Sequence, residues 1–135
     1  MKIVIDSYAW IEHFIGSKKG QKTDEILENA DEVYTPDIVL AEVARKYARE
    51  GIDKETIFER LTQMEEASNI TYIDAKLAAV AATCYLEMEE NAEKSQLRNP
   101  SLFDAVILAM GKSLGAKILT GDQHFKDLPE TIWLE

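Results

Sequence analysis

The stretch Ile3-Val4-Ile5-Asp6-Ser7 decides how this chain is interpreted. Its three consecutive β-branched residues are typical of a strand that is buried on both faces of a parallel sheet. A second apolar run, Lys117-Ile118-Leu119-Thr120, is followed by Gly121 and Asp122. In open α/β sheets, ligands bind beyond the carboxyl ends of the parallel strands. Two aspartates that each follow a buried strand therefore predict one shared acidic site.

Strand and helix signals alternate along the rest of the sequence, which is typical of βα units and a mostly parallel sheet. We expect strands at about 2–6, 33–35, 70–73, 117–120 and 131–134, with helices between them. The predicted fold class is therefore α/β with five strands. A chain of 135 residues has the length of one domain, and we expect a single domain over 1–135.

Several helix boundaries can be placed from capping signals. Thr35-Pro36-Asp37 predicts a helix start, with Thr35 as the N-cap, proline at the first helical position and an acid in the first turn. Asp53 and Asp74 precede two further helices and are expected to cap them. The segment from Glu89 to Arg98 is polar, and we expect a mobile loop there.

The composition is that of a folded, acidic protein. Hydrophobic residues make up 46% of the chain, and 15 basic against 25 acidic residues give a formal net charge of −10. This charge argues against a simple basic nucleic-acid binder. No apolar run approaches the length of a membrane span, the N-terminus lacks signal-peptide features, and the lone Cys84 suits a reducing compartment. We therefore expect a cytoplasmic protein with no membrane partner.

Two further acids interrupt apolar helical segments. Glu42 lies within Ile38-Val39-Leu40-Ala41-Glu42-Val43-Ala44, and Asp104 lies within Leu102-Phe103-Asp104-Ala105-Val106-Ile107-Leu108-Ala109. A carboxylate is costly to bury unless it is paired, hydrogen-bonded or bound to a metal, although each acid could instead lie on the exposed stripe of its helix. A cluster of carboxylates needs a cation to offset its mutual repulsion. Oxygen ligands favour Mg²⁺ or Mn²⁺, and no Cys/His cluster supports zinc.

These acidic segments carry a resemblance to a known family. The chain resembles the PIN-domain ribonucleases and is most similar to the VapC-type toxins of toxin–antitoxin pairs. The resemblance covers the whole length and rests on four blocks: Ile3 to Ser7 with Trp10-Ile11, Pro36 to Val43, Leu102 to Ala109, and Leu119 to Phe125. It implies a three-layer α/β/α sandwich with a five-stranded, mostly parallel sheet.

The resemblance also implies a catalytic site for the hydrolysis of RNA phosphodiester bonds. By position, the acidic quartet that holds Mg²⁺ or Mn²⁺ in the family corresponds to Asp6, Glu42, Asp104 and Asp122. Thr120 matches a small hydroxyl residue beside the last acid, and Ser7 stands where many members have threonine. Both hydroxyls are expected to donate hydrogen bonds to the carboxylates.

Positive charge near the acids is the candidate contact for RNA. Arg45 and Arg49 lie three and seven residues beyond Glu42, on the same face of the helix, where they could hold a phosphate or pair with acids. Lys18, Lys19 and Lys22 form a basic cluster of the kind that is usually solvated, with RNA contact as the alternative. His124 matches a loop anchor in the family rather than a metal ligand.

The leading interpretation is a metal-dependent endoribonuclease that is the toxin of a pair, with an antitoxin partner and a homodimeric state. Two alternatives within the family stay open: a PIN nuclease of RNA processing or quality control, and an inactive PIN scaffold that binds protein partners. A receiver-type signalling domain also places aspartates at strand ends. It needs a lysine after the fifth strand, which is missing here, and Asp74 after the third strand has no acidic companion.

Overall fold

The computed structural model describes residues 1–135 and contains one five-stranded sheet in which all paired strands are parallel. The strands are β1 (Lys2–Ile5), β2 (Glu32–Pro36), β3 (Asn69–Thr71), β4 (Lys117–Thr120) and β5 (Thr131–Trp133). The helices are α1 (Ser7–Ile15), α2 (Lys18–Glu28), α3 (Asp37–Arg49), α4 (Lys54–Ala67), α5 (Ala75–Lys94) and α6 (Leu102–Leu114), with a 3₁₀ turn η1 (Gln123–Phe125). The predicted five-stranded α/β fold is confirmed.

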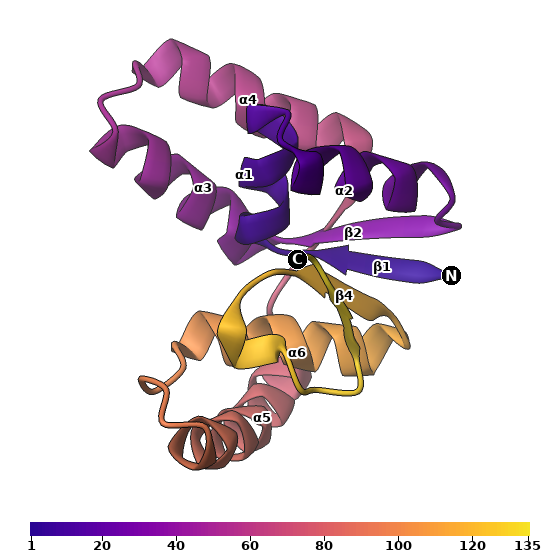
Figure 1. Cartoon of the computed structure of the whole chain (residues 1–135), viewed down its shortest axis with the longest axis vertical. Coiled ribbons are helices and arrows are strands. Elements are labelled where there is room, and N and C mark those ends of the chain that lie inside the picture. Colours follow the sequence, from indigo (N-terminus) through magenta and orange to yellow (C-terminus); the bar gives the residue numbers. More distant parts are fainter.

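The helices form two layers, one on each side of the sheet (Figure 1). Helices α1 to α4 lie on one side, and α5 and α6 lie on the other. The strand order is β3-β2-β1-β4-β5, so the chain runs outward from β1 to β3 and then returns to place β4 beside β1. The direction of winding reverses between β1 and β4. At such a point the carboxyl ends of the strands border a crevice, which is where open α/β sheets bind ligands.

The two central strands form the middle of the hydrophobic core. Ile3, Val4, Ile5, Ile118 and Leu119 have no exposed surface. Burial of an aliphatic side chain of this size stabilises a fold by about 1.5–3 kcal/mol. The register pairs Ile5 with Leu119, so the chain leaves both strands at the same level of the sheet edge.

The prediction that Thr35 caps a helix is wrong. Strand β2 extends to Pro36, and Pro36 is the N-cap of α3 without any side-chain cap bond. The buried Thr35 hydroxyl instead accepts from Trp10 Nε1 at 3.1 Å and bonds to Ser68 Oγ at 2.7 Å. A buried indole N–H needs an acceptor, and this tertiary bond overrides the local capping signal.

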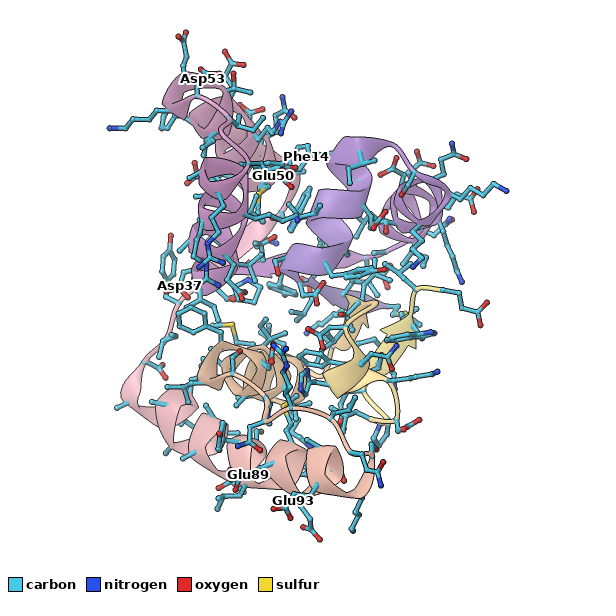
Figure 2. All side chains as sticks on the ribbon, turned by 60° about the vertical axis from the view of Figure 1, so that its left-hand side comes forward. Phe14, Asp37, Glu50, Asp53, Glu89 and Glu93 are labelled. Carbon is cyan, nitrogen blue, oxygen red and sulfur yellow. The ribbon has the colours of Figure 1, made fainter.

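The prediction of a mobile loop from Glu89 to Arg98 is wrong in its first half. Helix α5 continues to Lys94, and Figure 2 shows Glu89 and Glu93 on this helix, at the periphery of the molecule. The apolar partners on the opposite side, such as Met88, are buried, so the polar residues are the solvent side of an amphipathic helix. None of the helices combines the length and the apolar character that a membrane crossing requires.

The other predicted caps are found. Asp53 is the N-cap of α4 and Asp74 is the N-cap of α5, and each side chain accepts from a backbone N–H of its first turn. These bonds satisfy amide groups that have no partner within the helix.

Helix α2 crosses α1 at very short range. A Cβ atom added to Gly20 would lie 2.1 Å from the carbonyl oxygen of Glu12 and 2.8 Å from its carbonyl carbon. Only glycine permits this approach of the two backbones. The Ser17 hydroxyl accepts from Gly20 N at 3.0 Å and caps α2. Together these contacts fix the first turn of α2, including Lys19, against α1.

Candidate metal centre

The four predicted acids come from four segments that meet at the carboxyl edge of the sheet. Asp6 follows β1 and Asp122 follows β4, which are neighbouring strands. Glu42 lies on α3 in one helical layer, and Asp104 lies on α6 in the other (Figure 1). The charges of Asp122 and Glu42 raise the pKa of Asp6, and those of Asp104 and Asp122 raise the pKa of Glu42, which is consistent with a single cluster.

Asp6 is the most deeply buried acid of the cluster, with 3% of its surface exposed. One carboxylate oxygen accepts from Ala9 N at 3.0 Å, which caps α1, and the other accepts from the Thr120 hydroxyl. Burial raises the pKa of Asp6 to about 7, although these two hydrogen bonds lower it. The negative charges of Asp122 and Glu42 add to the increase. Without a cation, the folded protein therefore holds a proton on this carboxyl group near neutral pH.

Thr120 connects two of the acids. Its buried hydroxyl donates to Asp6 and accepts from the backbone N–H of Asp122 at 2.9 Å. Ser7 makes no such contact, contrary to expectation. It begins α1 and lines the adjacent groove, and both oxygens of Asp6 already accept hydrogen bonds from Ala9 and Thr120.

Asp104 and Asp122 are both oriented by backbone N–H groups. Asp104 and Ser101 form a capping box at the start of α6: Ser101 Oγ accepts from Asp104 N at 3.1 Å, and the Asp104 carboxylate accepts from Ser101 N at 3.0 Å. Burial raises the pKa of Asp104, and the charge of Asp122 adds to this effect. Asp122 caps η1 by accepting from His124 N at 2.8 Å.

His124 completes a close set with these two acids. One potential ligand atom from each of Asp104, Asp122 and His124 lies within 4.8 Å of the other two. However, His124 Nδ1 lies 3.0 Å from Asp122 Oδ1, and Nε2 lies 2.8 Å from the carbonyl oxygen of Arg98. Both partners are acceptors, so both ring nitrogens must donate, which requires the imidazolium form.

This geometry makes His124 a positive counter-charge to the acids rather than a ligand. Burial lowers the pKa of His124, but its hydrogen bonds to Arg98 and Asp122 and the nearby acids outweigh burial, so the net pKa is raised. The family resemblance implies a loop anchor at His124, and the structure has a bond from its ring to the carbonyl oxygen of Arg98. The sequence does not predict the contact with Asp122, and the only signal for that contact is a spacing of two residues.

Glu42 has a buried oxygen atom without a hydrogen-bond partner. Its Oε1 is shielded from solvent and accepts no hydrogen bond. The pKa of Glu42 is raised to about 7, chiefly by burial and also by the charges of Asp104 and Asp122, while Arg45 opposes the increase. A buried acceptor without a donor is unfavourable, and a bound cation is one of the few ways to satisfy it.

An open groove of about 610 Å³ leads away from the acids between α1 and α3. Arg45 and Arg49 lie on its α3 wall as exposed side chains, and neither forms an ion pair with a carboxylate. Lys46 on the same wall does, with Glu50 at 3.3 Å. The two arginines therefore remain available to a negatively charged ligand in the groove.

The residues of the cluster fit a hard divalent cation. The donors are carboxylate oxygens, several have raised pKa values, and one oxygen has no partner. Such a set suits Mg²⁺ or Mn²⁺. The single cysteine, Cys84, is buried in α5 and offers no thiolate to this site.

The raised pKa of Asp6 predicts a pH dependence of stability in the absence of metal. The unfolded chain releases this proton near pH 3.8, whereas the folded protein holds it to about pH 7. The folded state thus binds more protons in this window, so the free energy of unfolding falls as the pH rises through it. Urea unfolding in EDTA at a series of pH values should show this fall in the wild type and a smaller one in Asp6→Asn. Parallel pH profiles for the two proteins would contradict the assignment.

Comparison with known proteins identifies the family. A family model described as PIN domain matches residues 3–131. The chain is also 26% identical over 132 residues to Ribonuclease VapC3 of Pyrobaculum aerophilum, with 94% of each chain covered. The matched region contains all four acids of the cluster.

Solved structures share the same fold. A toxin–antitoxin complex from Klebsiella pneumoniae superposes with a TM-score of 0.73 at 17% identity over 98% of each chain. VapC20 of Mycobacterium tuberculosis, described as a Sarcin-Ricin loop cleaving toxin, gives a TM-score of 0.71 at 17% identity, covering 94% of this chain and 95% of that one. VapBC2 of Rickettsia felis, bound to a promoter DNA fragment, gives 0.67 at 20% identity over 98% and 97%. The family model spans nearly the whole chain, and the chain therefore belongs to the PIN domain family.

Proposed function

We propose that this protein is a Mg²⁺- or Mn²⁺-dependent endoribonuclease and the toxin of a toxin–antitoxin pair. The observation that carries the proposal is the unpartnered, buried Oε1 of Glu42 within a cluster of carboxylates of raised pKa. Such a cluster is unfavourable without a cation and well suited to one. The metal-dependent chemistry of PIN nucleases supports the same conclusion.

The proposed roles follow from the positions of the side chains. Asp6, Asp104, Asp122 and Glu42 would hold the cation. When bound, a divalent cation polarises a phosphodiester and makes a water molecule more acidic. Thr120 keeps Asp6 and Asp122 in a fixed relation through its two hydrogen bonds. The His124 imidazolium holds Asp122 and the loop at Arg98 together.

The groove supplies a route for the RNA substrate. Arg45 and Arg49 line it close to the acidic end and carry no paired carboxylate. We propose that they bind phosphates on either side of the cleaved bond, because a guanidinium can donate two parallel hydrogen bonds to phosphate oxygens. This local positive charge explains how a chain of net charge −10 can bind RNA at one place.

An antitoxin and a second copy of this chain are the protein partners in the same proposal. The Klebsiella pneumoniae and Rickettsia felis structures are described as toxin–antitoxin and VapBC assemblies, which supports an antitoxin for this chain. Several large apolar side chains are exposed, among them Tyr72 at 72% and Leu102 at 60%. Such side chains are suited to burial in a homodimer or against a partner in the cytoplasm.

The direct test is metal-dependent cleavage. Purified protein is incubated with total RNA in EDTA, and then with Mg²⁺ or Mn²⁺ restored. We expect no cleavage in EDTA and full recovery on addition of either ion, together with an increase in the melting temperature, because the cation offsets the repulsion among the acids. Cleavage that persists in EDTA would show that the activity does not come from this site.

A further inference from the structure

Beyond the acids and the two arginines, the groove is lined by an aromatic side chain, Tyr8, to which Lys19 is hydrogen-bonded. Tyr8 is in the first turn of α1 and lines the groove together with Glu42 and Asp122. Its ring packs directly on Gly121, the residue before Asp122. A Cβ atom at Gly121 would lie 2.3 Å from Tyr8 Cε1 and 2.5 Å from Cζ. The chain therefore places an aromatic side chain beside the acidic end of the groove, and Gly121 makes the room for it.

Lys19 is held at this aromatic ring by a specific hydrogen bond. Its Nζ donates to Tyr8 Oη at 2.7 Å and lies 5.4 Å from the ring centroid. No carboxylate lies within ion-pair distance of this ammonium group. The acid whose charge acts on Lys19 is Glu12, and the carboxylate of Glu12 accepts a hydrogen bond from the Ser17 hydroxyl.

The neighbouring lysines differ from Lys19 in one respect. Lys18 and Lys22 belong to the same helix and are exposed, and neither forms a hydrogen bond or ion pair through its ammonium group. Lys19 alone is half-buried and bonded to a residue of the groove. The close packing of α2 on α1 at Gly20 produces this placement.

We propose that Tyr8 and Lys19 position the RNA on the α1 wall of the groove, with the ring against a nucleotide next to the cleaved bond and the ammonium group on a phosphate. This inference rests on the proposed function. Arg45 and Arg49 lie on the α3 wall, and Lys19 adjoins the opposite wall through its bond to Tyr8. An aromatic side chain and a cation at one point match the two parts of a nucleotide, its flat base and its charged phosphate.

The test compares Lys19→Gln with Lys18→Gln, since both remove one positive charge from the first turn of α2. Binding of a labelled single-stranded RNA of mixed sequence is measured by fluorescence anisotropy in EDTA at several salt concentrations. We expect Lys19→Gln to raise the Kd roughly tenfold and to reduce the slope of log Kd against log salt by about one, as loss of a phosphate contact does. Lys18→Gln should leave both near the wild-type values. Equal effects of the two variants would overturn the inference.

Tyr8 is tested through a second pair of variants. Tyr8→Leu removes the aromatic face and should raise the Kd roughly tenfold, within the range for loss of one stacked base. Tyr8→Phe keeps the ring and loses only the bond to Lys19, so its effect should disappear in a Lys19→Gln background. Fully additive effects of Tyr8→Phe and Lys19→Gln would show that the phenol does not act through Lys19, contrary to the proposal.

Cleavage kinetics with Mn²⁺ separate this inference from the function on which it rests. Lys19→Gln should raise KM and leave kcat close to wild type, because Lys19 binds substrate away from the reacting bond. If wild type cleaves RNA and Lys19→Gln has the KM of Lys18→Gln, only the positioning role is wrong. If wild type neither binds nor cleaves RNA, the proposed function itself is wrong and this inference fails with it.

Discussion

Asp104→Asn is expected to lower metal-dependent RNA cleavage by about 10³-fold, corresponding to a loss of about 4 kcal/mol of transition-state stabilisation. Asparagine has the same shape and can still accept from Ser101 N, so the capping box that starts α6 should survive. The variant removes only the negative charge that the cation requires. Steady-state cleavage of a defined RNA with Mn²⁺ measures the effect.

The same substitution should stabilise the metal-free protein. Burial and the charge of Asp122 raise the pKa of Asp104, so its ionised form is unfavourable in the folded state. The melting temperature in EDTA should therefore rise in Asp104→Asn, and the increase produced by Mn²⁺ should shrink. Asp53→Asn is the matched control, because it changes an exposed N-cap aspartate outside the site. An Asp104→Asn protein with the activity of Asp53→Asn would remove Asp104 from the catalytic site.

Gly20→Ala is expected to lower the free energy of unfolding by about 2–3 kcal/mol. The new methyl group would meet the Glu12 carbonyl oxygen at 2.1 Å, and this atom belongs to the backbone of α1 and cannot rotate away. The two helices must separate, and overpacking of this kind typically costs about 1–3 kcal/mol. Alanine has a better helix propensity than glycine, which recovers up to about 1 kcal/mol. A net loss at the upper end of the expected range of about 2–3 kcal/mol therefore requires a clash that costs more than about 3 kcal/mol.

Urea unfolding at fixed pH measures this change, with Gln21→Ala as the control. Gln21 is the next residue of α2 and is exposed, so its substitution should change stability by less than about 0.5 kcal/mol. Gly20→Ala should also weaken RNA binding, because a displaced α2 moves Lys19 from Tyr8. A variant as stable as wild type would show that α1 and α2 do not pack as closely as the structure indicates.

The sequence predicts most of the fold because the decisive signals are local. The β-branched run Ile3 to Ile5 and the run Lys117 to Thr120 identify the central strands to within one residue. The caps Asp53 and Asp74 are also local, since each side chain bonds within its own first turn. Thr35 is the opposite case, because its partner Trp10 comes from a different segment of the chain.

The candidate site likewise combines features that follow from local signals with contacts that only the folded structure reveals. The positions of the acids follow from strand ends and from apolar helical context, both of which the sequence displays. The contacts of His124 and Tyr8 do not, because they depend on which backbone atoms approach in the folded state. The tight contact of Tyr8 on Gly121 has no pattern in the sequence, since a glycine before an aspartate is common at the end of any strand.

The acids of the centre are divided between the two helical layers, with Glu42 on α3 and Asp104 on α6, and the sheet lies between them. Neither half of the polypeptide can assemble the acidic cluster alone. Because β4 and Asp122 follow the other three acids in the chain, a growing polypeptide carries those three carboxylates before the fourth is available. A protein that degrades RNA would thus stay harmless to the messenger that encodes it until Asp122 has been translated.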